Sequence, residues 1–190
     1  MTPKDPNQLP ADLPVPIDDG AAAHLEGMRL PSIALPSTEG DHIDFGSTNG
    51  TLVLYVYPKA GRPGIDPPPE WDATPGARGC TPQSCAFRDH HKELKDLGAD
   101  VIGLSTQTTQ EQTEFVEEHH LPFPLVSDAG FAFAKELNLP TFTFDDTTLL
   151  KRTTLIADDG VISKVFYPVF PPARNAEEVI GYLSERRPDR

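Results

Sequence analysis

Two cysteines, Cys80 and Cys85, carry the most reactive chemistry in this chain. They are its only cysteines and lie five positions apart. Thr81 suits an N-cap or first-turn position and Pro82 suits a first helical position, so a helix is predicted to begin here. Backbone N–H groups at a helix start have no intrahelical partner and carry partial positive charge, and Arg78 stands just upstream of Cys80. Both features favour a thiolate over a thiol at Cys80.

The spacing of the two cysteines favours a redox couple that cycles. In an ideal helix, residues five apart have rotated about 500° and risen about 7.5 Å, which separates their Cα atoms by roughly 8–9 Å. A disulfide needs less than about 7 Å, so Cys80 and Cys85 can bond only if the first turns of the helix unwind. The spacing alone leaves two alternatives open: a pair of buried apolar cysteines, and a fixed surface disulfide.

Composition indicates an acidic protein of a reducing compartment. The chain has 16 basic and 29 acidic side chains, a formal charge of −13 and a pI near 4.7, which disfavours nucleic acid and anionic membranes as partners. It has no apolar run near the roughly 20 residues that span a bilayer, and no apolar segment behind a basic N-terminus. We therefore expect a cytoplasmic protein, where a lone cysteine pair is more often catalytic than structural.

Other candidate sites in the sequence carry weaker signals. The pairs His90-His91 and His119-His120 contain a residue type that binds zinc, but neighbours on a helix point about 100° apart and nothing completes a tetrahedral set. We interpret them as exposed surface histidines and expect no metal site. No serine lies in a Gly-x-Ser-x-Gly context and no glycine-rich loop is suited to phosphate, which argues against serine hydrolase and nucleotide-binding functions.

The elements that must position the cysteines alternate between strand and helix. Residues Thr51–Tyr57 form a nearly continuous apolar, β-branched and aromatic run, typical of a central strand buried on both faces. An amphipathic helix is predicted from about Pro82 to Leu97. The further predicted elements are a hairpin over Ser32–Leu35 and His42–Phe45, strands over Asp100–Thr106, Phe123–Val126, Arg152–Ala157 and Val161–Tyr167, and helices over Thr109–His119, Ala129–Leu137 and Ala176–Arg186. This order predicts an α/β protein with a mixed central β-sheet flanked by helices on both faces.

The chain is predicted to divide into an arm and one domain. Residues 1–29 are rich in proline and are interpreted as an N-terminal arm that wraps the domain or stays mobile, while residues 30–190 form the domain. Residues 60–79 are rich in proline and glycine and lead directly to Cys80. We expect a functional loop that shapes the mouth of a pocket, against the alternative of a tolerated surface insertion.

Three segments of the chain match one family pattern: Tyr57-Pro58-Lys59, the cysteine segment Gly79–Asp89, and Leu121–Asp128. They resemble the peroxiredoxins, and most closely the Q type, also called bacterioferritin-comigratory proteins. The resemblance continues through Arg152–Ile156 and Val161–Phe166 and covers roughly residues 30–184. The N-terminal arm lies outside it.

The resemblance implies a thioredoxin-like fold and names the roles of several residues. Cys80 matches the peroxidatic cysteine, Cys85 the resolving cysteine and Arg152 the arginine beside the thiolate. Gln83 matches a polar position of the family, for which we expect a secondary, orienting role.

The chain departs from the family pattern just before Cys80. Members of this type usually carry Thr-Pro-Gly immediately before the peroxidatic cysteine, whereas here Ala77-Arg78-Gly79 separates Thr74-Pro75-Gly76 from Cys80. We expect Thr74 to take the place of that threonine through a bulged loop, ahead of Thr81, Arg78 or a backbone N–H. Weakened peroxide turnover is the remaining possibility.

The expected activity is thiol-dependent reduction of hydrogen peroxide or organic hydroperoxides. Cys80 becomes a sulfenic acid, Cys85 condenses with it to an intramolecular disulfide, and thioredoxin or a glutaredoxin restores both thiols without a bound cofactor. Two alternatives stay open: a thiol–disulfide oxidoreductase, for which Cys-x-x-Cys is the usual motif, and a non-catalytic redox-sensing module. We expect a monomer or weak homodimer, because the apolar segment Tyr167–Pro172 either forms an interface or covers the edge of the core.

Overall fold

Strand β3 (Thr51–Val56) is the centre of the main sheet, and its side chains from Leu52 onward are at most 1% exposed. In residues 7–62 and 64–186, which the computed structural model describes, this sheet has five strands in the order β5-β4-β3-β8-β9. β3 pairs in parallel with β4 (Ala99–Ser105) and antiparallel with β8 (Thr153–Asp158). The sheet is therefore mixed, as the sequence predicts.

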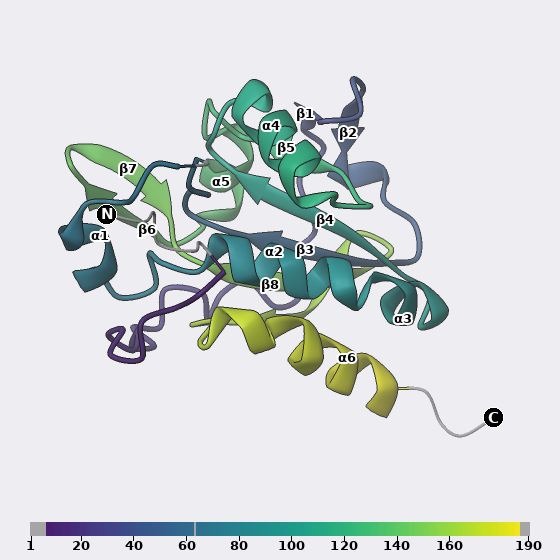
Figure 1. Cartoon of the computed structure of the whole chain (residues 1–190). Coiled ribbons are helices and arrows are strands. Elements are labelled where there is room, and N and C mark those ends of the chain that lie inside the picture. The colour runs from purple at the N-terminus through teal and green to yellow at the C-terminus, as the bar shows by residue number, and fades with distance from the viewer. Residues whose placement is uncertain (1–6, 63, 187–190) are drawn as a thin grey trace.

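The remaining elements follow in chain order around this centre (Figure 1). The strands are β1 (Ala34–Pro36), β2 (His42–Asp44), β5 (Leu125–Ser127), β6 (Thr141–Phe144), β7 (Thr147–Leu150) and β9 (Val161–Phe166). The helices are α1 (Pro69–Ala73), α2 (Cys80–Asp89), α3 (His91–Asp96), α4 (Thr109–His119), α5 (Ala132–Leu137) and α6 (Asn175–Glu185), with 3-10 turns η1 (Phe45–Ser47) and η2 (Pro172–Arg174). None of the helices in the described part of the chain is long and apolar enough to cross a membrane.

Two apolar clusters, one on each face of the sheet, hold the helices in place. On one face, Val53 and Tyr55 pack with side chains of α2, α3, α4 and α6, including Phe87 and Phe115. On the other face, Leu52 and Leu54 of the same strand pack with α5 and with the segment that precedes β3. Alternate side chains of β3 therefore point to opposite faces of the sheet and pack in the two apolar clusters. This arrangement confirms the predicted helices on both faces.

Helix α2 begins at Cys80, slightly earlier than the start predicted near Pro82. Gly79 is the N-cap, with φ 115°, a left-handed backbone that favours glycine. A Cβ atom at this position would lie 2.5 Å from Cγ of Pro172, so the close approach of η2 also requires glycine. Thr81 thus occupies the first turn. The predicted single helix over 82–97 is divided, because His90 leaves helical geometry and α3 starts anew at His91.

The proline-rich insertion has structure of its own that its composition concealed. Residues Pro69–Ala73 form the short helix α1, and the unpredicted hairpin β6–β7 lies beside it (Figure 1). Trp71 of α1 packs against Phe144 of β6, with ring centroids 4.9 Å apart, and joins Ala77 and Leu149 in a small apolar cluster. This cluster ties the insertion to the domain.

The described part of the N-terminal segment lies along the domain. Leu25 and Leu30 are buried in the core, and Arg29 forms a β-bridge with Val161. Asp19 accepts hydrogen bonds from Lys151 and Tyr167, which hold the pKa of its carboxyl well below the usual range. The division at residues 29 and 30 remains a prediction, and residues 1–6 lie outside the described part.

The apolar segment Tyr167–Pro172 packs partly into the domain. Val169 is 1% exposed and Pro172 is buried against Gly79. This placement favours the interpretation that the segment covers the edge of the core.

Candidate active site

Cys80 and Arg152 meet at the start of α2. Cys80 is 3% exposed. Val56 at the C-terminal end of β3 pairs with Thr153, so Arg152 comes to the end of the sheet where α2 begins. Its Nη2 atom donates to Cys80 Sγ across 3.3 Å. A guanidinium this close stabilises negative charge on the sulfur.

The guanidinium of Arg152 also fixes the loop that leads into α2. Nη2 contacts the carbonyl oxygens of Gly76, Ala77 and Arg78 at 3.3, 3.1 and 3.3 Å. Nη1 donates to Oε1 of Gln83 at 2.6 Å. One buried cation thus holds the loop, the helix and the sulfur in a single arrangement.

Gln83 links Arg152 to a second buried amide that the sequence did not single out, Asn175 at the start of α6. Gln83 Nε2 donates to Asn175 Oδ1 at 3.0 Å, and the Thr154 hydroxyl donates to the same oxygen at 2.7 Å. Gln83 and Asn175 are fully buried. These contacts point the Gln83 oxygen at Arg152, which is the geometry an orienting residue needs, and no local sequence signal marks Asn175.

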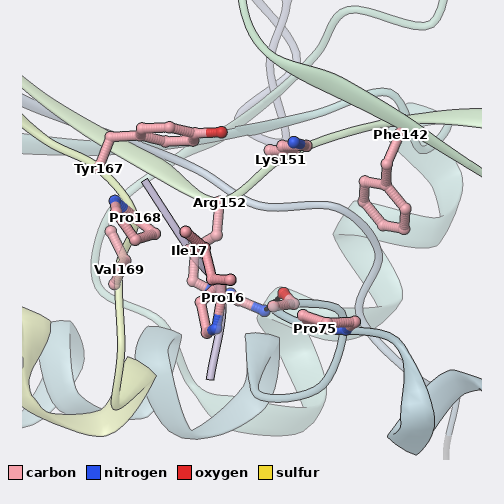
Figure 2. Close-up of a pocket in the computed structure, with 10 residues that line it drawn as sticks. Pro16, Ile17, Pro75, Phe142, Lys151, Arg152, Tyr167, Pro168 and Val169 are labelled. Atoms are coloured by element: carbon pink, nitrogen blue, oxygen red, sulfur yellow. Dashed lines mark hydrogen bonds between the residues drawn. The ribbon is translucent and has the colours of Figure 1, made fainter. Parts of the chain in front are cut away.

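Arg152 also lines a small cavity of about 100 Å³ (Figure 2). Figure 2 shows Pro16 and Ile17 of the N-terminal segment beside Arg152 and Pro75. Arg152 Nε is buried and finds no hydrogen-bond partner among the described residues. The N-terminal segment therefore forms part of the wall behind the arginine.

A larger cavity of about 680 Å³ opens over Cys80. Its walls come from the insertion and from the β6–β7 hairpin, and they include Ile65, Trp71, Phe144 and Leu149. The expectation that the insertion shapes a pocket over Cys80 agrees with this geometry, because a loop folded elsewhere would leave the cysteine without these walls.

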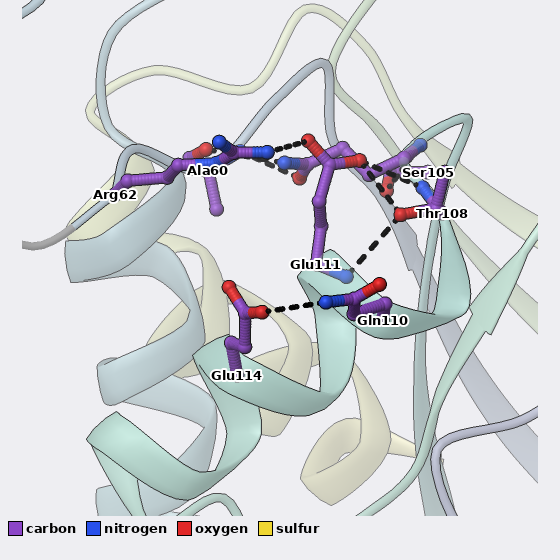
Figure 3. A network of polar contacts seen from close by, with 8 residues as sticks. Ala60, Arg62, Ser105, Thr108, Gln110, Glu111 and Glu114 are labelled. Carbon is purple, nitrogen blue, oxygen red and sulfur yellow. Dashed lines mark hydrogen bonds and ion pairs between the residues drawn. The ribbon is translucent and has the colours of Figure 1, made fainter.

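Polar contacts fasten the start of the insertion to α4 (Figure 3). Ala60 exchanges two hydrogen bonds with the Gln107 side chain, at 2.9 and 3.2 Å. Arg62 forms an ion pair with Glu111 at 3.0 Å. Glu111 also closes a capping box with Thr108, the N-cap of α4. The N-terminal cap of α4 therefore also anchors the pocket wall.

Thr74, expected to take the place of the family's threonine, lies at the end of α1. It is the C-cap of α1, and its hydroxyl donates to the Glu70 carbonyl at 2.8 Å. The described residues that line the cavity over Cys80 do not include Thr74, whereas they include Thr81 and Arg78. The Thr74 hydroxyl is thus engaged at the end of α1, and the role expected of it beside Cys80 stays a prediction.

Arg78 lies beside the cavity but already has an anionic partner. Its Nη1 atom donates to Asp72 Oδ1 at 2.8 Å, and the side chain is 8% exposed. The expected contribution of Arg78 to a Cys80 thiolate is therefore offset by a carboxylate. Arg152, by contrast, donates directly to the Cys80 sulfur.

Cys85 lies about 1.4 turns along α2 from Cys80, and both thiols are free. Since α2 is intact, the two sulfurs can join only after its first turns unwind. Cys85 Sγ lies 3.9 Å from His119 Nδ1. Burial raises the pKa of the Cys85 thiol, and burial lowers the pKa of His119. The interpretation of His119 as an exposed surface histidine is wrong, because its side chain is 11% exposed.

Comparison with known proteins places most of the chain in one family. The family model described as Redoxin matches residues 25–180. The chloroplastic peroxiredoxin Q of Sedum lineare is 32% identical over 160 residues, which cover 83% of this chain and 77% of that protein. The chloroplastic peroxiredoxin Q of Arabidopsis thaliana is 31% identical over 160 residues, with 83% and 66% covered.

Solved structures repeat the same fold. Peroxidoxin BcpB from Mycobacterium tuberculosis aligns with a TM-score of 0.69 at 26% identity, over 86% of this chain and 98% of that one. Peroxiredoxin Q from Xanthomonas campestris aligns with a TM-score of 0.66 at 22% identity, over 84% and 96%, which is a likeness of fold.

Proposed function

This chain belongs to the Redoxin family and, within it, to the Q-type peroxiredoxins, and from that premise we propose that Cys80 is the residue that reduces peroxide. The chain is a thiol-dependent peroxidase. The observation that carries the assignment of Cys80 is the 3.3 Å contact between Arg152 Nη2 and Cys80 Sγ at the start of a helix, beneath an open cavity.

The first step breaks the O–O bond. The Cys80 thiolate attacks one peroxide oxygen, an S–O bond forms, and the other oxygen leaves as hydroxide or alkoxide, which takes up a proton to become water or an alcohol. Sulfur is oxidised to the sulfenic acid as the peroxide is reduced. Arg152 and the backbone N–H groups of Cys80 and Thr81 at the start of α2 stabilise the developing negative charge.

The second step uses Cys85. Its sulfur attacks the sulfenic sulfur of Cys80, an S–S bond forms, the S–O bond breaks, and water is released. The helical spacing supports a step in which α2 unwinds locally before the bond forms. An external dithiol, thioredoxin or a glutaredoxin, then returns two electrons by disulfide exchange. Such a reductant requires a reducing compartment, and we propose the cytoplasm.

Among peroxides, we propose organic hydroperoxides as good substrates. The cavity over Cys80 is far larger than hydrogen peroxide requires, and part of its wall is apolar, with Trp71, Phe144 and Leu149. The structure of the bacterioferritin comigratory protein of Xanthomonas campestris is described in terms of alkyl peroxide reduction activity. That likeness is one of fold, so the support for this chain is the cavity itself.

The decisive experiment is peroxide consumption with excess thioredoxin system, comparing wild type with Cys80→Ser and Cys85→Ser. We expect sustained turnover in wild type and none in Cys80→Ser. Cys85→Ser should consume one equivalent and then stop. Wild-type turnover in Cys85→Ser would overturn its resolving role, and single-turnover behaviour of the wild-type protein would favour the redox sensor.

A further inference from the structure

Beside the second half of α2, a cysteine contacts a histidine, and the same histidine contacts a glutamate. Cys85 Sγ is 3.9 Å from His119 Nδ1, and His119 Nε2 is 3.5 Å from Glu118 Oε2. A nucleophile, a base in contact with it and a third group that orients the base are the parts of an activated-thiol arrangement. The peroxide step at Cys80 uses none of the three.

The resolving step requires that the Cys85 thiol lose its proton, and this arrangement places a base beside it. The nucleophile in disulfide chemistry is the thiolate. Burial raises the pKa of the Cys85 thiol, the carboxylates of Asp89 and Glu118 raise it further, and Arg88 is the cation that opposes them. Cys85 is therefore protonated at neutral pH and needs an acceptor for its proton before it can attack.

His119 is in the right state to accept that proton. Burial lowers the pKa of its imidazole, and so do Arg88 and His120, whereas Glu118 raises it. The ring is neutral at pH 7. The tautomer that carries its proton on Nε2 places that proton toward the Glu118 carboxylate, 3.5 Å away, and leaves the Nδ1 lone pair toward Cys85.

The position of His119 is fixed by the helix that carries Cys85. Arg88 Nη1 donates to the His119 carbonyl oxygen at 2.8 Å, which joins α2 to the end of α4. The imidazole also packs on the ring of Phe115, with centroids 4.6 Å apart. The histidine is therefore held against Cys85 for as long as α2 keeps its helical form.

We propose that His119 is the general base that deprotonates Cys85 for the resolving step, with Glu118 orienting the imidazole; this inference rests on the proposed role of Cys85. His119 Nδ1 takes the proton of the Cys85 thiol while α2 is helical. The sulfur electron pair then forms the S–S bond to Cys80, and the S–O bond of the sulfenic acid breaks. The leaving hydroxide takes up a proton, and the imidazolium returns its own to solvent. One water is released in total.

The test separates the two chemical steps in a single turnover. Reduced protein is mixed with one equivalent of peroxide, and samples are quenched with dimedone and a thiol alkylator at successive times. Mass spectrometry then gives the rate of sulfenic acid formation at Cys80 and the rate of its conversion to the disulfide. The variants are His119→Gln, Glu118→Gln and, as matched control, His120→Asn, which changes the exposed neighbour in a left-handed position that asparagine tolerates.

We expect His119→Gln to form the sulfenic acid at the wild-type rate and to resolve it about 10²-fold more slowly at pH 7, the lower end of a general-base contribution. Glu118→Gln should give a smaller loss in the same step, and His120→Asn none. If His119→Gln perturbs folding, as checked by circular dichroism and melting, Glu118→Gln carries the test.

The pH profile distinguishes a base from a structural residue. Wild-type resolution should reach a plateau by neutral pH, because a histidine of lowered pKa is already unprotonated there. In His119→Gln the rate should keep rising with pH toward the raised pKa of Cys85. Wild-type resolution in both variants, or parallel pH profiles, would overturn the inference. Loss of turnover in Cys80→Ser and arrest of Cys85→Ser after one equivalent would still stand, so the proposed function is tested separately.

Discussion

The Nη2 atom of Arg152 lies 3.3 Å from the sulfur of Cys80, although 72 positions separate the two residues in the chain. The same nitrogen contacts three carbonyl oxygens of the loop before α2. The arginine therefore sets the shape of the loop as well as the charge beside the sulfur. Removing the arginine therefore affects both the loop and the charge beside the sulfur.

Replacing Arg152 by lysine should lower the rate of Cys80 oxidation by about 10²-fold, the loss typical of one transition-state hydrogen-bond donor. Lysine keeps the positive charge but loses the planar fork that reaches the sulfur, the loop and Gln83 together. Stopped-flow peroxide reduction at fixed pH gives the rate. The control is Arg174→Lys, an exposed arginine on η2. Equal rates in Arg152→Lys and wild type would show that charge alone is sufficient.

Gln83→Ala should weaken both folding and catalysis. The change leaves Arg152 Nη1 without its buried acceptor and removes one of the two donors to Asn175 Oδ1, which should cost about 1–3 kcal/mol of unfolding free energy. Cys80 oxidation should slow, because the Gln83 oxygen no longer holds Arg152 Nη1 in place. Urea unfolding and single-turnover kinetics measure the two effects. Gln110→Ala, an exposed glutamine of α4, is the control and should change neither.

Thr74→Val should leave the rate of peroxide reduction within about twofold of wild type. The Thr74 hydroxyl donates to the Glu70 carbonyl at the end of α1, so its loss removes a helix-end contact worth roughly 0.5–1.5 kcal/mol. Thr81→Val is the informative partner, because Thr81 lies on the cavity wall. A tenfold loss in Thr74→Val would restore the threonine role expected from the family pattern and imply that the insertion rearranges when peroxide binds.

Trp71→Ala should act on substrate choice. Trp71 lines the cavity and packs on Phe144, so its removal takes away apolar wall that an organic tail would contact. We expect kcat/KM to fall about tenfold for a bulky hydroperoxide such as cumene hydroperoxide and to stay unchanged for hydrogen peroxide. Steady-state assays with each peroxide measure the two values. Trp71→Phe should recover most of the loss. An equal fall for both peroxides would indicate damage to the Cys80 loop and contradict a tail-binding wall.

Gly79→Ala should destabilise the protein by about 2–4 kcal/mol, since it combines a left-handed backbone with a steric clash. Gly79 has φ 115°, and a Cβ atom there would meet Pro172 at 2.5 Å. Gly61→Ala is a matched control in the same insertion, where a Cβ atom has open space. Thermal and urea unfolding give the comparison. Equal stability of the two variants would mean that the loop before α2 has room to shift.

Much of the fold was accessible from the sequence because its signals are local. The nearly continuous apolar run of β3 and the alternation of strand and helix patterns each depend on neighbours within one element. The start of α2 near Cys80 is equally local. The resemblance to Q-type peroxiredoxins added Arg152 and the thioredoxin-like fold, which no pattern within one element contains.

The elements that could not be predicted from the sequence share one cause. The β6–β7 hairpin was missed, and α1 was hidden in a proline-rich stretch, because these short elements are stabilised by Trp71 packing against Phe144 across the chain. The same helix α1 engages the Thr74 hydroxyl at its end.

The sequence by itself determined that two cysteines lie on one helix at a spacing that forbids a disulfide without unwinding. Only the tertiary structure decided which groups surround each sulfur: Arg152 beside Cys80, and His119 beside Cys85. The physical reason is that helix geometry is set by bonds between near neighbours, whereas these contacts join separate elements whose approach depends on how the two apolar faces of the sheet are packed.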